Sequence, residues 1–159
     1  MSSNPSQLME KALSLLSYRA HSRKELSDKL RRKGGCSEEE LNAVLNRLEE
    51  LGFLNDETYA AAVVRHAAAK GYGKNRVAAE LARRGISKDL WDEALSEMPE
   101  SDDMLDRLVH ARLRDPQDRD EVRKVSAALV RKGYSWSEVR QAIQRVNESA
   151  IYENTDYED

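Results

Sequence analysis

The stretch SRKELSDKLRRKG, residues 22–34, recurs twice further along the chain and decides the fold. It aligns without gaps with GKNRVAAELARRG (73–85) and EVRKVSAALVRKG (121–133). In each copy an aliphatic residue is followed four positions later by leucine and, after four more, by glycine. A spacing of four places both apolar side chains on one face of a helix, and a glycine just beyond the last turn is typical of a helix C-terminus. Each copy therefore predicts one amphipathic helix that ends at its glycine.

Two further helical segments accompany every copy. The upstream segments are LMEKALSLLSYRA, DETYAAAVVRHAAAK and DDMLDRLVHARLR. The downstream segments, which follow a serine placed soon after the glycine, are SEEELNAVLNRLEEL, SKDLWDEALSEM and SWSEVRQAIQRV. Self-similarity at a fixed period is the signature of a repeat architecture. The sequence therefore predicts a three-helix unit of about fifty residues that occurs three times, giving nine helices.

Capping residues support the expected helix ends. Serine followed three positions later by glutamate predicts a capping box, in which each residue satisfies a free backbone N–H of the other. The pairs are Ser22 with Glu25, Ser37 with Glu40, and Ser135 with Glu138. Gly34, Gly85 and Gly133 stand where a residue in the left-handed conformation would end a helix.

The expected fold is all-α, an elongated array of three tandem three-helix repeats, because repeat units contact mainly their neighbours. The expected segments are a disordered N-terminus (1–8), repeat 1 (9–54), repeat 2 (55–98), repeat 3 (99–147) and an acidic C-terminal tail (148–159). An elongated monomer is the expected state of the protein.

Composition agrees with this class. Apolar residues make up 40% of the 159 residues, charged residues 35% and aromatic residues 6%, and runs of β-branched residues that would build strands are absent. No stretch reaches the roughly 20 apolar residues that span a bilayer, and the N-terminus lacks the apolar core of a signal peptide. The single cysteine, Cys36, cannot form an internal disulfide, which fits a reducing compartment. A cytoplasmic location without membrane contact is expected.

The segment Gly71-Tyr72-Gly73-Lys74 invites comparison with a phosphate-binding loop. Such a loop needs four residues between its glycines and a preceding strand, and neither is present. In the repeat alignment Gly73 falls on Ser22, the expected N-cap, and glycine is acceptable at that position. Gly73 is therefore predicted to be an N-cap, with Tyr72 packed on Val77 as a hydrophobic staple.

The sequence offers no constellation of catalytic or metal-binding residues. The three histidines, His21, His66 and His110, lie one in each repeat, and none has a second ligand at a metal-binding spacing. Cys36 has no assigned base partner that would activate it as a nucleophile. No enzymatic activity, metal or cofactor is expected. The large aromatic residues Trp91, Trp136 and Phe53 fall on or beside apolar stripes and are expected to pack in the core.

Basic residues are the candidate binding groups. Residues 19–33 carry seven lysines and arginines against two acids, and residues 65–88 carry seven against one, while acidic blocks lie between and beyond them. Cations in a last helical turn complement the helix dipole, which accounts for pairs such as Arg83-Arg84. Arg23, Lys24, Lys74 and Arg76 fall in first turns instead, where the dipole disfavours them. These four indicate an anionic partner.

Three stretches resemble a known family. HSRKELSDKL (21–30), ELGFLNDETYA (50–60) and KGYGKNRVAAELARRGIS (70–87) are similar to corresponding stretches of the RecX family of bacterial RecA regulators. The likeness runs from about residue 10 to residue 146. Repeat 3 shares only the turn at 131–135 and the apolar spacing, and the acidic ending IYENTDYED departs from some relatives.

The resemblance implies a non-enzymatic protein that binds RecA filaments on DNA. It implies inhibition of RecA ATPase, strand exchange and co-protease activity, and so modulation of DNA repair, recombination and the SOS response. Single-stranded DNA would be contacted through the filament, with weak direct DNA binding at most. The candidate RecA- and DNA-binding residues are Arg23, Lys24, Arg31, Arg32, Lys33, Lys70, Tyr72, Lys74, Arg76, Arg83, Arg84, Arg131 and Lys132.

Two other functions remain open from the residues alone. Three-helix units with a tight turn are also found in helix-turn-helix proteins that bind DNA by themselves. The net charge of -3 disfavours this alternative, because nucleic-acid-binding domains are usually basic. The repeats would equally suit a scaffold for a different protein partner.

Overall fold

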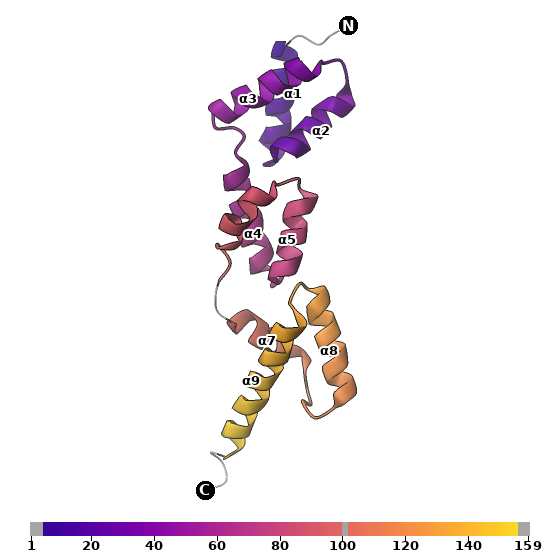
Figure 1. Cartoon of the computed structure of the whole chain (residues 1–159), viewed down its shortest axis with the longest axis vertical. Coiled ribbons are helices and arrows are strands. Elements are labelled where there is room, and N and C mark those ends of the chain that lie inside the picture. The colour runs from indigo at the N-terminus through magenta and orange to yellow at the C-terminus, as the bar shows by residue number, and fades with distance from the viewer. Residues whose placement is uncertain (1–4, 100–101, 156–159) are drawn as a thin grey trace. The chain divides into compact units, whose positions relative to one another are not determined.

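The computed structural model describes residues 5–99 and 102–155, and within them the chain is helical and contains no strand. The all-α prediction is confirmed. The helices are α1 (Pro5–Tyr18), α2 (Arg23–Lys33), α3 (Glu38–Glu50), α4 (Asp56–Ala69), α5 (Lys74–Arg83), the 3₁₀ helix η1 (Lys88–Leu90), α6 (Trp91–Leu95), α7 (Asp103–Arg112), α8 (Arg119–Arg131) and α9 (Trp136–Thr155) (Figure 1).

The expected caps define most helix ends. The side chains of Ser22 and Ser37 each accept a hydrogen bond from the backbone N–H three residues on, and the carboxylates of Glu25 and Glu40 each accept one from the backbone N–H of that serine. Ser135 and Glu138 exchange the same two bonds, each 3.0 Å long, at the start of α9. The three glycines after α2, α5 and α8 all have positive φ. The capping predictions are therefore confirmed.

The third helix of repeat 2 is shorter than expected. The segment that begins at Ser87 forms the single 3₁₀ turn η1 and then the five-residue helix α6. The Ser87 side chain makes no capping hydrogen bond, because the Leu90 N–H donates instead to the Ser87 carbonyl over 3.0 Å, the bond of a 3₁₀ turn. Leu90 also stands where the other repeats have the glutamate of the capping box. Without the reciprocal cap, the first turn winds as 3₁₀ helix.

The ends of the described chain also differ from expectation. Helix α1 begins at Pro5 and the Leu8 side chain is buried, so residues 5–8 do not belong to a disordered N-terminus. Proline is tolerated in the first turn because its missing N–H has no helical partner there. At the other end α9 continues to Thr155, so the first part of the expected tail is helical. Residues 1–4 and 156–159 lie outside the described residues.

The chain divides into two compact units. The first comprises Met1–Val64 and Ala79–Glu97, and the second comprises Arg65–Ala78 and Met98–Asp159. The division passes through α4 and α5, so it does not follow the expected repeat boundaries. Those boundaries stay a prediction, as does the elongation of the array.

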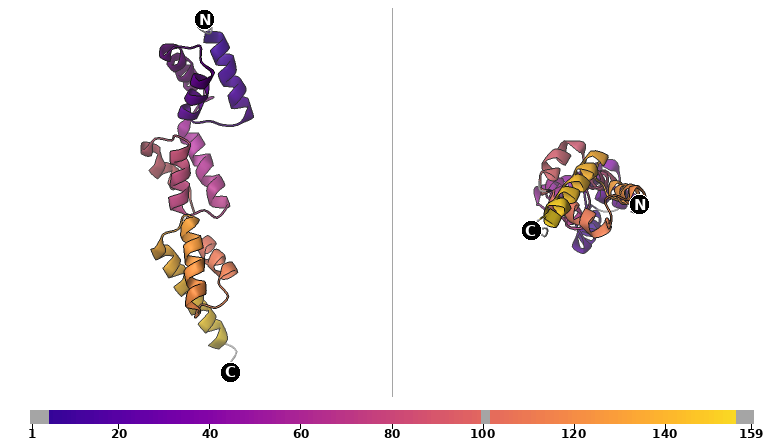
Figure 2. Two further views of the ribbon diagram at one scale, coloured as in Figure 1. Left: turned by 90° about the vertical axis from the view of Figure 1, so that its right-hand side faces the viewer. Right: turned by 90° about the horizontal axis from the view of Figure 1, so that it is seen from below.

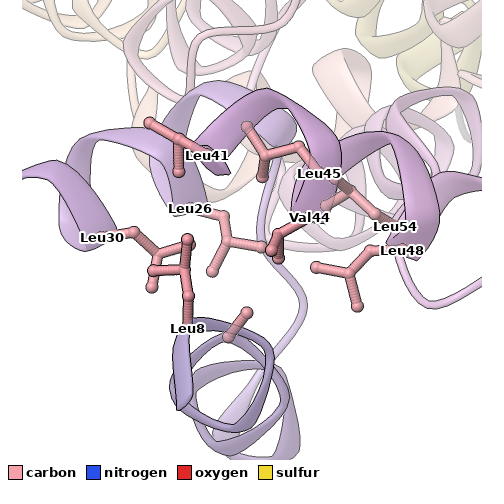
Figure 3. Packing of buried hydrophobic residues seen from close by; sticks show 9 residues of the cluster. Leu8, Leu26, Leu30, Leu41, Val44, Leu45, Leu48 and Leu54 are labelled. Carbon is pink, nitrogen blue, oxygen red and sulfur yellow. The ribbon is translucent and has the colours of Figure 1, made fainter. Parts of the chain in front are cut away.

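Aliphatic side chains from α1, α2 and α3 form the main core of the first unit (Figure 3). Leu26 and Leu30 of α2 are fully buried and meet Leu8 from α1. The third side of the core comes from α3 through Leu41, Val44, Leu45 and Leu48. Burying a leucine stabilises the fold by roughly 1.5–3 kcal/mol, so this cluster alone accounts for a large part of the unit's stability.

Helices α7, α8 and α9 form the core of the second unit, and α9 contacts both of the others (Figures 1 and 2). The cluster consists of Leu105, Val109, Leu113, Val125, Leu129, Tyr134, Val139, Ala142 and Val146. On the surface beside it, Arg145 of α9 forms hydrogen bonds of 2.8–3.2 Å with both carboxylate oxygens of Asp106 on α7. None of the described helices has the length and apolarity required of a transmembrane span.

Candidate functional site

The start of α5 is joined by hydrogen bonds to the turn between α8 and α9, within the second unit. The Gly73 N–H donates to the Lys132 carbonyl over 2.9 Å, and the Asn75 N–H donates to the Gly133 carbonyl over 3.0 Å. The buried Tyr134 hydroxyl donates to the Gly71 carbonyl over 2.8 Å, and burial raises the pKa of this phenol. Donors at the start of α5 are thus bound to carbonyls that α8 leaves free. These bonds leave no phosphate cradle at Gly73.

This joint requires two glycines. A Cβ atom on Gly73 would lie 2.5 Å from the Gly133 carbonyl carbon, and one on Gly133 would lie 2.5 Å from Arg76 Cβ. Both distances are shorter than real Cβ contacts, and the first is to backbone, which cannot turn aside. Gly133 also has φ of +112°, which L-residues with side chains avoid. The predicted N-cap position of Gly73 is confirmed, and its absence of a side chain lets the two turns meet.

Two basic side chains lie near an aromatic ring at this joint. The guanidinium carbon of Arg76 lies 4.2 Å from the centroid of the Tyr72 ring, and Lys132 Nζ lies 6.0 Å from it. Both are within the range of a cation–π interaction. Lys70, Lys74 and Arg131 flank these residues in the sequence, and all three are exposed. The Tyr72 cluster is the set Lys70, Tyr72, Lys74, Arg76, Arg131 and Lys132.

The Tyr72 cluster holds five cations, and no carboxylate in the described part of the chain forms an ion pair with any of them. Arg76 over Tyr72 is a contact that the sequence did not indicate, and the expected packing of Tyr72 on Val77 stays a prediction. Like charges held together without counterions attract anions. The cluster is therefore the best candidate in this chain for an anion-binding surface.

A second joint of the same kind lies within the first unit. The Ser22 hydroxyl, at the start of α2, donates to the Arg84 carbonyl over 2.5 Å. Arg84 occupies the position of Lys132 in the repeat alignment, just before the glycine that ends the helix. A Cβ atom on Gly85 would lie 2.8 Å from Lys24 Cβ, a close approach like that of 2.5 Å between a Cβ on Gly133 and Arg76 Cβ. The start of the middle helix in one repeat thus meets the glycine turn of the next repeat in both joints.

Three of the four basic residues at the first joint form ion pairs within the protein. Arg23 lies 2.8 Å from Glu49, and both Arg83 and Arg84 contact Glu80, at 2.6 and 2.8 Å. Arg84 also donates to the Tyr59 hydroxyl over 2.6 Å. Arg23 therefore has partners within the protein, Glu49 and the Asn46 amide on α3, so the fold accounts for this cation. Its contact with RecA or DNA stays a prediction. Lys24 has no acidic partner among the described residues.

The other three candidates lie at the far end of α2. Arg31 forms a two-pronged contact with Glu38 at 2.8 and 3.0 Å, which raises the pKa of its guanidinium and lowers the pKa of the glutamate. Arg32 and Lys33 are exposed in the same last turn. The structure therefore separates the thirteen candidates into the Tyr72 cluster, the ion-paired first joint with Lys24, and this end of α2.

Glu80→Gln is expected to destabilise the protein in a pH-dependent manner. Hydrogen bonds from Arg83 and then Arg84 lower the pKa of Glu80 to about 2, against an opposing effect of burial. Because the folded pKa lies below the usual 4.5, the stabilisation is complete above pH 4.5 and is lost as the pH falls toward 2. Solvent screening limits it to about 1 kcal/mol. Urea unfolding should show this deficit for the variant at pH 7.

The deficit should shrink as the pH falls from 4.5 to 2, until both proteins unfold at similar urea concentrations. The control is Glu57→Gln, which removes an exposed acid from the first turn of α4. A deficit for Glu80→Gln that stays constant with pH would show that the ion pairs do not stabilise the fold.

Two of the three large aromatic residues are not core residues, contrary to the prediction. Trp136 is 54% exposed and Phe53 is 57% exposed. Trp91 is half-buried, and its indole N–H donates to the Ile86 carbonyl over 2.9 Å. Apolar spacing failed here because Trp136 and Phe53 stand at a helix start and in a linker, where the periodicity of a helix does not fix the side-chain direction.

The histidines and the cysteine form no cluster. His21 is buried, with Nδ1 3.0 Å from the Arg19 carbonyl and Nε2 2.8 Å from Lys29 Nζ. Burial and then the Arg19 charge lower the pKa of His21, which fits a neutral ring that donates at Nδ1 and accepts at Nε2. In the described ranges no three His, Cys, Asp or Glu residues are grouped as metal ligands.

Two stretches of the chain match family models. Residues 9–48 match the model of the first three-helix domain of RecX, and residues 55–95 match that of the second. Regulatory protein RecX of Trichlorobacter lovleyi is 37% identical over 155 residues, covering 91% of this chain and 98% of the relative. RecX of Pelodictyon phaeoclathratiforme is 32% identical over 137 residues, covering 84% of each chain.

Solved structures agree with these relatives. The crystal structure of RecX from Lactobacillus salivarius superimposes with a TM-score of 0.76, at 26% sequence identity, over 90% of this chain and 96% of that one. A second RecX crystal structure shares the fold with a TM-score of 0.73. The repeated helices, the domain matches and the full-length relatives lead to one conclusion: the chain belongs to the RecX family of regulatory proteins.

Proposed function

We propose that this protein binds RecA filaments on DNA and inhibits RecA ATPase, strand exchange and co-protease activity without catalysing a reaction itself. It thereby modulates recombination, DNA repair and the SOS response in the cytoplasm. Membership of a regulatory family supports this proposal, and so does the chemistry of the surface. A nucleoprotein filament offers acidic protein side chains and DNA phosphates together, and both are anions.

The observation that carries the proposal is the Tyr72 cluster. Its five cations have no acidic partner among the described residues, whereas at the equivalent joint in the first unit Arg23, Arg83 and Arg84 form ion pairs with Glu49 and Glu80. The ion pairs of the first joint show that the fold can satisfy basic residues at this place. The unpaired cations of the second joint therefore have a use outside the fold, and we assign this surface to the filament.

A free-standing DNA-binding protein is the second candidate function. The Tyr72 cluster supports it, but the net charge of -3 opposes strong binding to DNA alone. A scaffold for another protein is the third candidate, and the repeats suit it equally. These candidates differ in whether RecA is required and in how steeply binding depends on salt.

The proposal is tested by measuring RecA ATPase on single-stranded DNA with and without the protein, over a series of salt concentrations. Inhibition is expected at concentrations well below those at which the protein binds the same DNA alone. Binding to DNA alone should weaken steeply with salt, because each neutralised phosphate releases counterions. An unchanged ATPase rate under saturating protein would contradict the proposal, and inhibition that only matches occupancy of free DNA would favour the second candidate.

A further inference from the structure

A groove lies between α8 and α9, and it shares no lining residue with the Tyr72 cluster. It has a volume of about 420 Å³ and is lined by Pro116, Arg119, Val122, Arg123, Ser126, Trp136, Arg140 and Ile143. Its lining combines an apolar floor with three arginines and contains no acidic residue. None of these eight positions was a candidate in the sequence.

The side chains converge because of helical spacing. Arg119 and Arg123 are four residues apart on α8, and Trp136 and Arg140 are four apart on α9, so each pair shares one face of its helix. Along each helix axis the two residues are separated by about 6 Å. The Trp136 indole, 54% exposed, thus stands in a groove with guanidinium groups on both walls.

The repeat fold does not require these residues. At the position of Trp136 the other repeats have Glu38 and Lys88, and at the position of Arg140 they have Asn42 and Asp92. Repeats 1 and 2 form their helices without a tryptophan or an arginine there. A tryptophan and an arginine at these two positions therefore occur in repeat 3 alone.

The position of the groove explains why it is open. In repeats 1 and 2 the start of the middle helix packs against the glycine turn of the next repeat, at Gly85 and Gly133. In repeat 3 the equivalent helix start, Glu121-Val122-Arg123-Lys124, has Val122 and Arg123 in the groove wall instead. Helix α8 also begins further upstream, at Arg119, and is capped by Asp118, which accepts from two backbone N–H groups. The surface used as a joint elsewhere is open here.

We propose that this groove binds single-stranded nucleic acid directly, with a base stacked on Trp136 and phosphates held by Arg119, Arg123 and Arg140. Single-stranded nucleic acid is bound without sequence preference by aromatic side chains in a positively charged groove, since every base has a π face. The inference does not depend on RecA, because the isolated chain carries the whole site.

The lining favours a nucleic acid over an acidic peptide. The backbone of α8 and α9 is hydrogen-bonded within the helices, so the groove offers no edge to which an extended peptide could pair. A planar, delocalised guanidinium suits phosphate, and it also stacks on a base. The acid recorded beside the site, Asp120, lies 3.8 Å from Arg123, and both side chains are more than three-quarters exposed. At 3.8 Å the two groups are too far apart for a hydrogen bond, so the N–H donors of Arg123 remain available to a phosphate.

The test uses a fluorescein-labelled 15-mer of thymidylate and measures its polarisation with the full chain at several salt concentrations. Trp136→Ala is expected to weaken binding by about tenfold or more, the loss typical of one stacked base. The triple variant Arg119→Gln, Arg123→Gln, Arg140→Gln should reduce the slope of log K against log salt by about 2, because each phosphate on a single strand contributes about 0.7.

The matched control is Arg107→Gln, Arg112→Gln, Arg114→Gln, which removes the same charge from exposed arginines on and just after α7. It should keep most of the affinity and of the salt slope. Circular dichroism should show native helix content for all variants. If Trp136→Ala disturbs folding, quenching of Trp136 fluorescence by unlabelled thymidylate in Trp91→Phe provides the same information.

Three results would overturn the proposal: unchanged affinity of a folded Trp136→Ala, equal losses in both triple variants, or absence of oligonucleotide binding by the wild type. Displacement of the oligonucleotide by an oligoglutamate of equal charge as effectively as by thymidylate would also overturn it, since the groove would then recognise charge alone. Inhibition of RecA ATPase is measured separately, so the failure of this inference leaves the proposed function intact and vice versa.

Discussion

Replacing Gly73 with alanine is expected to lower the free energy of unfolding by about 3 kcal/mol or more, the upper end of the effect of over-packing. The new Cβ would lie 2.5–2.6 Å from the carbonyl carbon and oxygen of Gly133 and from the Tyr134 nitrogen. All three are backbone atoms, so the α8–α9 turn must move away. That movement would break the hydrogen bonds from Gly73 and Asn75 to this turn. Urea unfolding followed by circular dichroism measures the loss.

Gly34→Ala is the matched control for this substitution. Gly34 follows α2 as the glycine of the first repeat, but a Cβ there would meet nothing within 4 Å. Its φ of +71° still disfavours alanine, at a cost of about 1 kcal/mol. Gly73 is not among the glycines with positive φ. The pair therefore separates the cost of a strained backbone from the cost of a blocked joint.

Equal losses of stability in Gly73→Ala and Gly34→Ala would contradict the close approach of the two turns. A larger loss of stability for Gly73→Ala would show that the joint, as well as the apolar core, stabilises the second unit. Gly133→Ala combines both costs and should be the most damaging of the three, because its Cβ would also meet Arg76.

The sequence was sufficient to predict the helices, because their signals are local. A capping box needs only residues three positions apart, as in Ser22 and Glu25, and a C-terminal glycine is read from the last turn. The same rule explains the one weak helix, since Leu90 replaces the glutamate of the box after Ser87. The prediction for the start of α1 was wrong: the helix begins at Pro5, and the Leu8 side chain in its first turn is buried.

The joints could not be predicted, because they connect residues about sixty positions apart. Local rules explain Gly73 as an N-cap, but its closeness to Gly133 depends on how α5 meets the α8–α9 turn. The sequence did contain one indication of a close contact, because glycine occupies position 73 where the first repeat has Ser22. Substituting glycine for a better N-cap costs little and permits close contact. That substitution alone does not say which segment approaches.

The partners of the basic residues also could not be predicted from the sequence. Helix-dipole arguments treated Arg23 and Lys74 alike, because the two hold equivalent positions in the repeat. Only the packing of α3 reveals that Glu49 neutralises Arg23. Trp136 was also misassigned, because its exposure depends on the surface that α8 and α9 leave open. Charge and aromatic content were visible in the sequence, whereas their partners were not.

Neutralising the Tyr72 cluster should weaken filament binding while leaving the fold intact. The variant is Lys70→Gln, Lys74→Gln, Arg76→Gln, and the expected loss is roughly 1–3 kcal/mol in sum, because exposed charge contacts are individually small. This corresponds to an increase of about 5- to 150-fold in the concentration that inhibits RecA ATPase by half. Removing Arg76 from the Tyr72 ring costs only about 0.5–1 kcal/mol of stability. The melting temperature should therefore stay within a few degrees.

The control removes the same charge from three arginines outside the candidate set that are ion-paired within the fold: Arg19→Gln, Arg47→Gln, Arg145→Gln, paired in the wild type with Glu25, Glu50 and Asp106. Their carboxylates screen them from an anionic partner, so inhibition should remain near the wild-type level although some stability is lost. The Tyr72-cluster variant should therefore lose inhibition and keep its stability, whereas the control should lose stability and keep its inhibition.

Inhibition by the Tyr72-cluster variant with an unchanged midpoint and salt dependence would refute the assignment of this surface. Equal losses of inhibition in both variants would instead mean that the filament responds to the net charge of the protein and not to the Tyr72 cluster.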